Sequence, residues 1–254
     1  MNRSAVPKAH GSAVGSQVSE VALRAVHIRA ADVASATTAF ETIVGSHAVQ
    51  RNAESQLGVG DAALRLSALP QVGADDDGPE PRRGIWALDI VLPHAQAAVV
   101  GASVDIHGMR VFVSAPGPAG RPVEARVKLD HVALMVHDID QATLAWERLT
   151  GLAAHRLAVH PVSRGTLAAS RFLLGPRMIE LLAPLPGKAS PLATRLAQLG
   201  EGPLAMALVA ADLEATLARL RAAGVGLVYN DPHWVVRPGD ASGVPIQLTP
   251  RVEH

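Results

Sequence analysis

Three polar side chains lie in otherwise apolar stretches of the second half of the chain, and their types could support chemistry. His131 lies in LDHVAL, Glu180 in MIELL and Gln247 in VPIQL. An imidazole can act as a general base, and a carboxylate can orient it. A buried carboxylate without a partner is costly, so Glu180 requires a cation such as Arg171 or Arg164, or a metal ion. The alternative is structural, because a lone histidine on a strand is commonly a core residue.

A repeated pattern predicts the elements that position these residues. Residues 127–151 begin with an apolar run, Val132–Val136, pass through Asp138 and end at Gly151, and residues 21–45 show the same order 106 positions earlier. The Asp can cap a helix by accepting from free backbone N–H groups. The Gly supplies a left-handed C-terminal stop. Each stretch therefore predicts a strand followed by a helix.

Strand-like segments such as Met178–Leu182 follow each of these stretches, and then comes a second, weaker kind of unit. The second kind starts with the apolar segments Gly84–Leu92 and Gly202–Ala210. It continues into the helix-like segments Pro93–Val100 and Asp212–Ala223. The order predicts an α+β fold of four βαβββ units that form two open curved sheets.

Two units make one module, which sets the expected domain organisation. We expect a disordered tail at residues 1–19, a first module at 20–127 and a second module at 128–254. Stretches rich in Gly, Pro or charge, at 71–83 and 184–190, are expected to be connections.

Composition excludes several classes of function. The 254 residues are 48% hydrophobic, and 23 Lys+Arg balance 23 Asp+Glu, so the basic surplus of a nucleic-acid binder is absent. There is no cysteine, hence no disulfide framework and no thiolate chemistry. Neither a secretory signal nor an uncharged run of about 20 apolar residues is present. We expect a cytoplasmic protein with a small-molecule partner rather than nucleic acid or membrane; a homodimer is compatible with the sequence.

Four stretches of the second half resemble the vicinal oxygen chelate (glyoxalase/bleomycin resistance/dioxygenase) superfamily, closest in pattern to methylmalonyl-CoA epimerase. They are LDHVALMVHDIDQATLAWERLTGL (129–152), MIELLAPL (178–185), GEGPLAMALVAADLEATLARLRAAGV (200–225) and RPGDASGVPIQL (237–248). The first half is similar more weakly, chiefly through Asp32–Gly45. The resemblance implies a cup-shaped sheet that holds a divalent metal, which polarises substrate oxygens and stabilises an enolate. It implies an isomerase or a lyase.

The resemblance also implies positions for four metal ligands in the second module. The first falls on His131, the second on Glu180 and the fourth on Gln247. The third falls within Gly202–Met206, where the histidine of the family is missing. The carboxylate base of the epimerases would lie near Gly165–Ala169, and that stretch has no carboxylate. His131, Glu180 and Gln247 are thus the candidate metal ligands, and His131 and Glu180 are the candidate catalytic residues.

The first module departs further from the implied ligand set. Ala25 takes the first position, Leu64 the second, Trp86 or Ala87 the third, and Glu124 alone matches the fourth. We therefore expect the first module to be a degenerate scaffold and the second to carry the site.

Three functions remain open. One is a metal-assisted isomerase or lyase on a small oxygenated molecule, using Co, Mn, Ni, Zn or Fe. Another is a binding protein without a metal, for sequestration or resistance, whose cavity is lined by Leu204, Ala205 and Met206. The last is a catalyst without a cofactor, in which His131 is the base and Glu180 orients it. Five further residues could lie at the mouth of the cup but are expected to be surface or packing residues: His160, Arg164, His233, Trp234 and Arg237.

Overall fold

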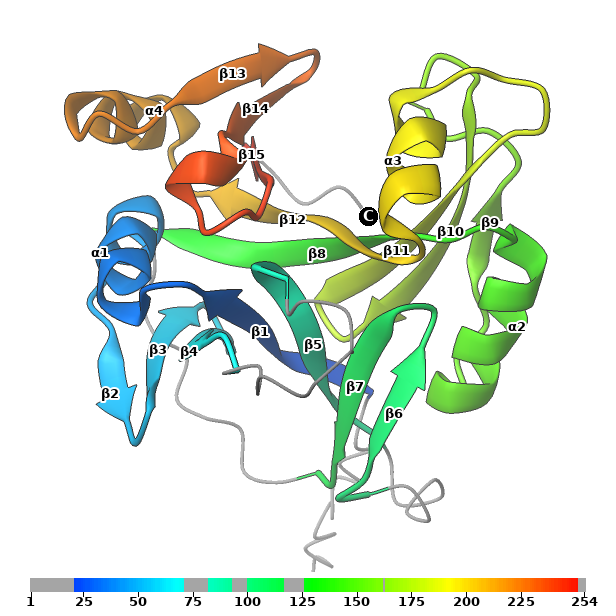
Figure 1. Cartoon of the computed structure of the whole chain (residues 1–254), viewed down its shortest axis with the longest axis horizontal. Helices are drawn as coiled ribbons and strands as arrows, with labels where there is room; N and C mark the ends of the chain where they lie inside the picture. Colours follow the sequence, from blue (N-terminus) through cyan, green and yellow to red (C-terminus); the bar gives the residue numbers. More distant parts are fainter. Residues whose placement is uncertain (1–20, 71–81, 93–99, 117–125, 162, 251–254) are drawn as a thin grey trace, which may run out of the picture.

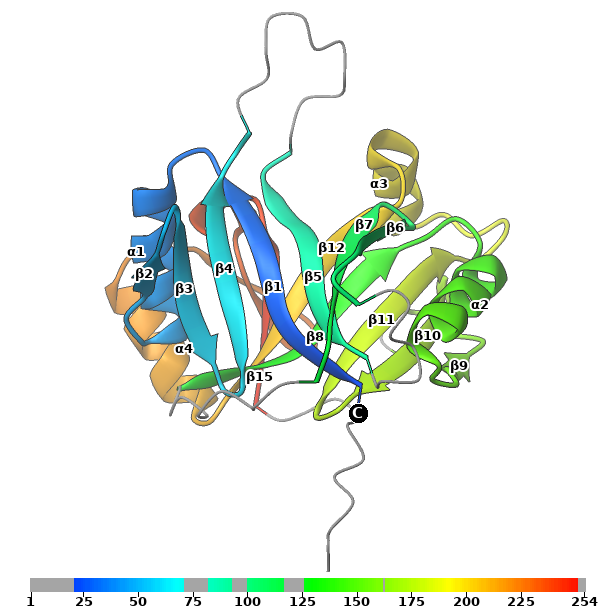
Figure 2. The same cartoon turned by 90° about the horizontal axis from the view of Figure 1, so that it is seen from below.

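The computed structural model describes residues 21–70, 82–92, 100–116, 126–161 and 163–250. They form two mixed sheets that pack against each other (Figures 1 and 2). In sheet order the first contains β2 (Val49–Arg51), β3 (Glu54–Val59), β4 (Ala62–Ala68), β1 (Ala22–Ala30), β5 (Gly84–Val91), β7 (Met109–Ser114) and β6 (Ser103–Ile106). The second contains β13 (Leu227–Asn230), β14 (His233–Val236), β15 (Ile246–Thr249), β12 (Gly202–Ala210), β8 (Val127–Met135), β11 (Arg177–Pro184), β10 (Leu167–Leu174) and β9 (His155–Leu157).

The two sheets repeat one strand order, which confirms the predicted α+β fold of two related open sheets. Read from β2 and from β9, the orders correspond strand by strand, and β13 is the additional strand of the second sheet. The predicted second-unit helix, Pro93–Val100, lies almost entirely outside the described residues, as do the tail at 1–19 and most of the connection at 71–83. The strands of one sheet fall within residues 22–114 and those of the other within 127–249. The module boundary itself stays a prediction.

The helices are α1 (Val33–Val44), α2 (Ile139–Thr150), α3 (Pro191–Leu199) and α4 (Leu213–Ala222), with a short 3₁₀ turn, η2 (Pro238–Asp240). Asp32 and Asp138 cap α1 and α2 through their side chains, and Gly45 and Gly151 end them with φ of 76° and 71°, as predicted. Helix α3 was not predicted. Ser190 caps it by accepting from the Ala193 N–H at 3.1 Å.

Irregularities in the strands are repeated too. Arg24 and Asp130 are extra residues, or bulges, at matching places in β1 and β8. Trp86 and Leu204 are extra residues at matching places in β5 and β12. A bulge changes which side chains share a face, so a shared bulge keeps the two sheets in the same register.

One continuous apolar core joins the two modules. It includes Val26 and Leu64 from the first sheet, Val132 and Met206 from the second, and Trp146 of α2. Trp146 packs on Phe172, with ring centroids 6.3 Å apart.

Two arginines of the second module also bind backbone carbonyls of the first. Arg177 donates to Leu23 O at 2.9 Å and pairs with Asp61. Arg219 of α4 donates to Ile43 O at 3.1 Å, at the end of α1. Among the described helices, none has the length and hydropathy needed to span a membrane.

Candidate functional site

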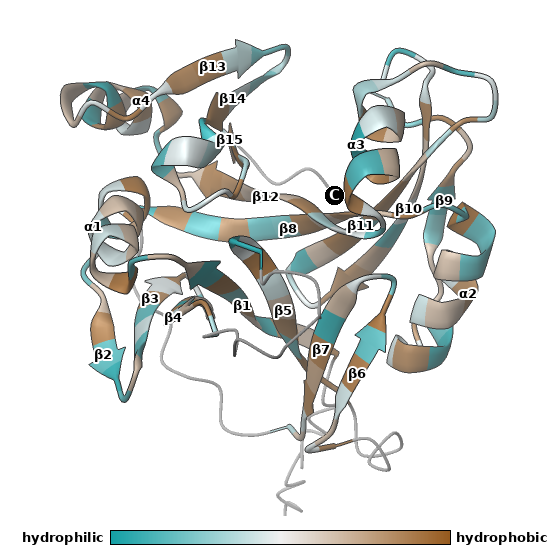
Figure 3. Cartoon of the chain, viewed as in Figure 1, coloured by the Kyte–Doolittle hydropathy of each residue, from teal (hydrophilic) through white to brown (hydrophobic). Residues whose placement is uncertain are grey.

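The second sheet has one face toward the main core and another that α3 covers, which we call the cup face. Ala133, Met135 and Leu182 lie on the cup face, where Leu192 and Leu196 of α3 pack on them. Helix α3 carries hydrophobic and hydrophilic residues on different sides (Figure 3), so its apolar side closes over the sheet. The pleat of β8 places His131 on the same face as Ala133.

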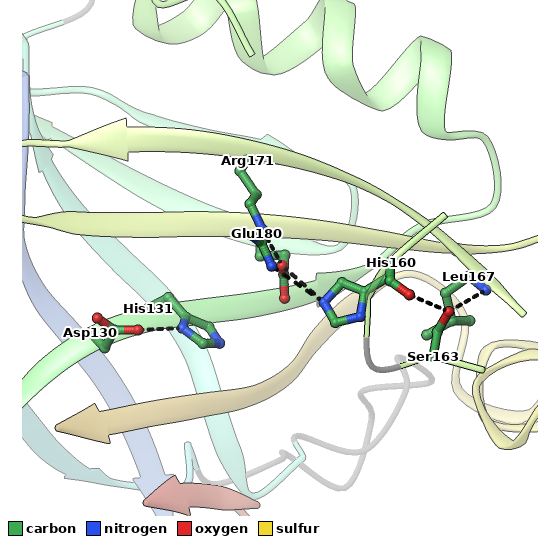
Figure 4. A network of polar contacts seen from close by, with 7 residues as sticks. All are labelled: Asp130, His131, His160, Ser163, Leu167, Arg171 and Glu180. Atoms are coloured by element: carbon green, nitrogen blue, oxygen red, sulfur yellow. Dashed lines mark hydrogen bonds and ion pairs between the residues drawn. The ribbon is translucent and has the colours of Figure 1, made fainter. Parts of the chain in front are cut away.

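His131 is held by its neighbour in sequence, Asp130. Consecutive residues of a regular strand point to opposite faces. Asp130 is the bulged residue of β8, and its Oδ2 lies 2.8 Å from His131 Nδ1 (Figure 4). The His131 side chain is 5% exposed and the Asp130 side chain 0%. Because a carboxylate only accepts, Nδ1 carries the proton and Nε2 is the basic nitrogen of the ring.

Glu180 has polar partners, as its burial requires. Arg171 lies directly opposite it on β10, and Arg171 Nε donates to Glu180 Oε1 at 2.7 Å. His160 Nε2 lies 3.3 Å from the same oxygen (Figure 4). Burial acts to raise the pKa of Glu180, but the hydrogen bond with His160 and the charges of His131, His160 and Arg171 outweigh it and lower the pKa to about 2. Of the partners that the sequence offered for Glu180, Arg171 is the one observed, and the His131 Nδ1 is bonded to Asp130 rather than to Glu180.

His160 comes from a connection that the first module lacks. Nine residues, 158–166, join β9 to β10, whereas two residues, 52–53, join β2 to β3. Ser163 Oγ donates to His160 O at 2.8 Å, and the His160 N–H donates to Leu167 O at 2.8 Å. His160 is 9% exposed, so of the two expectations for it, a surface or a packing residue, the structure shows a buried one. The unequal spacing of the two repeats, visible in the sequence, was the signal for this insertion.

The remaining candidates divide between the two faces of the sheet. Ala207 of β12 pairs with both His131 and Gln247, so the half-buried Gln247 shares the row and the face of His131. Leu204 packs with the cup-face cluster. Ala205 pairs with Ala133 and shares its face. Met206 is fully buried in the main core on the opposite face, so its assignment to the cavity lining was wrong.

This set of residues does not fit a divalent metal. The first position offers an imidazole and the fourth a neutral amide, while Leu204 and Ala205 at the third offer no donor. Glu180 Oε1 is bonded to the Arg171 guanidinium, whose charge repels a second cation. Within the described residues, no three His, Cys, Asp or Glu side chains come together as a metal would need.

The register of the first sheet corrects two of the implied positions there. Arg65 pairs with His27 as Glu180 pairs with Ala133, so Arg65 and not Leu64 takes the second position. Leu64 is in the main core. The fourth position falls on Phe112 of β7, which pairs with Asp89 as Gln247 pairs with Ala207. Glu124, to which the resemblance assigned the fourth position, lies outside the described residues, and β7 ends at Ser114.

Aromatic side chains occupy the corresponding face of the first sheet. The rings of His27, Trp86 and Phe112 pack together with centroids 5.2 to 5.7 Å apart. Burial and the charge of Arg65 lower the pKa of His27 to about 4, although Asp89 acts in the opposite direction. The rings fill this face of the first sheet, and the role of the first module as a scaffold stays a prediction.

Comparison with known proteins shows which family and which solved structures this chain resembles. Residues 129–247 match the sequence model of a family described as glyoxalase-like domain. A methylmalonyl-CoA epimerase from Mycobacterium tuberculosis is similar at 30% identity over 47% of this chain and 85% of its own, with a TM-score of 0.41. One from Streptomyces coelicolor, bound to 2-nitronate-propionyl-CoA, is 26% identical over 47% and 94%, with a TM-score of 0.40. A hypothetical protein from Bacillus halodurans is 23% identical over 50% and 96%, with a TM-score of 0.45. A search of curated proteins finds no match.

Proposed function

We propose a function from the premise that the chain belongs to the glyoxalase-like, or vicinal oxygen chelate, superfamily, whose sequence model its residues 129–247 match. The proposed activity is proton transfer on a small oxygenated molecule, of the isomerase or lyase kind, without a metal. It takes place on the cup face of the second module. The observation that carries the proposal is the buried contact of 2.8 Å between Asp130 and His131.

His131 is the proposed general base. Its Nε2 takes a proton from a carbon next to a carbonyl group, and the C–H electron pair moves into the carbonyl to give an enolate. In an isomerase the His131 imidazolium returns the proton, from the same side, to the neighbouring carbon of the enolate. In a lyase the enolate electrons expel a leaving group, which takes up the proton from the imidazolium. Gln247 is a poor metal ligand, but its amide N–H can donate to the enolate oxygen. Asp130 fixes the ring and stabilises the imidazolium that forms.

The position of α3 determines how a substrate reaches His131. The His131 side chain is 5% exposed, and Leu192 and Leu196 of α3 pack on the same face. We infer that α3 moves away from the sheet when a substrate enters. The charges of Glu180 and Arg171 neutralise each other in the closed state, which limits the cost of burying them.

Hydrogen exchange into a substrate tests this function directly. Methylmalonyl-CoA is the first probe, because similar solved structures are complexes with it or with 2-nitronate-propionyl-CoA. The hemithioacetal of methylglyoxal and glutathione is the second probe. In D2O, the wild type is expected to exchange the proton next to the carbonyl, followed by ¹H NMR, with and without EDTA. His131→Gln should lower the rate by at least about 100-fold, since general base catalysis contributes 10²–10⁴-fold.

Two variants make the test specific. Asp130→Asn should lower the rate less than His131→Gln and should change its pH profile, because the ring loses its orienting carboxylate. His137→Gln is the matched control: His137 is exposed, and its backbone N–H makes its bond to Glu201. Exchange that EDTA abolishes, or that His131→Gln leaves intact, would contradict the proposal.

A binding protein without catalysis is the second candidate, and the apolar character of the cup face favours it. Ala133, Met135, Ala169 and Leu182 present no polar group to a guest. Binding of the apolar dye ANS that weakens in Ala133→Phe, with no exchange of either probe, would support this candidate over the enzyme. A homodimer and a cytoplasmic location stay predictions from the sequence.

A further inference from the structure

A cleft with a volume of about 420 Å³ lies between the two modules, and His131, Glu180 and Gln247 are not part of its lining. The first module contributes the end of β1, the start of β5 and the hairpin of β6 and β7. The second contributes α3 and the start of β12. A cleft of this size fits a small organic molecule.

The lining of the cleft is strongly basic. Both oxygens of Asp105 bind Arg110 at 2.8 Å. Glu201 is bonded to His107 at 2.8 Å and accepts the His137 N–H at 2.7 Å. Among the described residues of the lining, these are the two acidic ones, and both are engaged. Five arginines line the same space: Arg29, Arg82, Arg83, Arg110 and Arg195.

Two of the arginines are poorly compensated. The Arg29 guanidinium lies 4.0 Å from the centre of the Trp86 ring, and burial and the charge of Arg110 lower its pKa. Arg195 of α3 has a buried Nε that, among the described residues, has no hydrogen-bond partner. Like charges in a partly buried cleft repel each other, and an anion between them relieves the repulsion.

We propose that this cleft binds a small molecule that carries two or more negative charges on phosphate or carboxylate groups. Guanidinium groups match the oxygens of both anions with two parallel hydrogen bonds. Leu199 and Leu204 form an apolar wall beside the arginines, which fits an organic anion with an apolar portion. The proposal does not rest on catalysis in the cup, although Leu204 belongs to both surfaces.

Isothermal titration calorimetry of the whole chain with pyrophosphate and with succinate tests the proposal. We expect at least one of the two anions to bind, and we expect its affinity to fall as salt is added. The tighter of the two identifies the anion as phosphate or carboxylate. Arg29→Gln and Arg195→Gln should each weaken binding by about tenfold, because a hydrogen bond to a charged group is lost.

The matched control is Arg221→Gln. Arg221 also lies over a tryptophan, 4.8 Å from the centre of the Trp234 ring, but it does not line the cleft. The affinity of Arg221→Gln for each anion should equal that of the wild type. Absence of binding for both anions, or equal binding in all three variants with circular dichroism showing them folded, would overturn the proposal. Because binding is measured without turnover, a failed exchange experiment leaves this test unaffected.

Discussion

At the scale of single residues, a carboxylate as buried as Glu180 depends on its cations. Arg171→Met should lower the free energy of unfolding by about 3 kcal/mol, because it leaves an uncompensated charge beside His160. Adding Glu180→Leu should restore most of the loss, since the charge that needed Arg171 is then gone. Urea unfolding at neutral pH measures both effects. If the double variant is less stable than Arg171→Met alone, the unpaired charge of Glu180 is not the cause of the loss in stability.

His27 predicts how stability depends on pH. Its pKa in the fold is about 4, against an ordinary value of 6.5, so the unfolded chain binds a proton that the folded chain does not. Its contribution is present above pH 6.5 and is lost as pH falls toward 4. Between pH 7.5 and 4.5 we expect a loss on the order of 2 kcal/mol from this residue. His27→Gln should show a smaller loss over the same range in urea unfolding; an identical loss would assign it to other groups.

The polar residues show where prediction from the sequence ends. His131, and the need of Glu180 for a cation such as Arg171 or Arg164 or for a metal, followed from charged or polar side chains in apolar runs. Asp130 was missed because a regular strand would direct it to the other face, and only the bulge in β8 brings it to His131. His160 was missed because its partner is 20 residues away across a connection without a regular pattern.

At the scale of elements, the hairpin of β6 and β7 docks one module on the other through its turn. His107 and Gly108 both have positive φ, 47° and 70°, as a two-residue hairpin requires. A Cβ on Gly108 would lie 2.0 Å from Glu201 O, where β12 begins. The turn therefore needs glycine for its conformation and for the close approach of the two backbones.

Two glycine variants separate these requirements. Gly108→Ala should lower the free energy of unfolding by about 3 kcal/mol, from left-handed strain plus displacement of Glu201. Gly101→Ala is the control, because Gly101 has φ of 82° but open space around its missing side chain. It should cost only the strain, about 1–2 kcal/mol. Equal losses in thermal unfolding would mean that the backbone contact with Glu201 contributes nothing.

Element prediction succeeded where two repeats support each other and failed where one stands alone. Helices α1 and α2 share an Asp cap and a Gly stop 106 residues apart. Helix α3 has nine residues and follows a Pro- and Gly-containing connection, so too few apolar positions repeat to reveal it. The fourth position of the first module was assigned to Glu124, whereas backbone pairing of β5 with β7 places Phe112 there, because the order of strands decides which residue reaches the cup face.

At the scale of the whole molecule, buried arginines fasten the second module to the first. Burial lowers the pKa of Arg177 to about 10, and the side chain binds Leu23 O and Asp61. Arg177→Met should lower the free energy of unfolding by about 2 kcal/mol, because a buried carbonyl loses its donor. Asp61→Asn should cost less, since the Asp61 side chain is 49% exposed and its ion pair is screened by solvent.

An exposed ion pair is the control for Arg177. Arg156 pairs with Asp140 on the surface, with side chains 52% and 69% exposed, so Arg156→Met should change stability by under about 0.5 kcal/mol. Chemical unfolding, followed by circular dichroism, compares the three variants. A loss in Arg156→Met as large as that in Arg177→Met would show that the inter-module contact is not special.

Helix α3 takes part in both sites, with Leu192 and Leu196 on the cup face and Arg195 and Leu199 in the cleft. A single rigid helix of nine residues cannot leave one without disturbing the other. An anion that binds Arg195 only while α3 is docked therefore opposes entry of a substrate into the cup. By linkage, a substrate in the cup lowers the affinity of the cleft for the anion by the same factor. The two affinities are reciprocal, so the cleft would act as a negative effector site for the chemistry at His131.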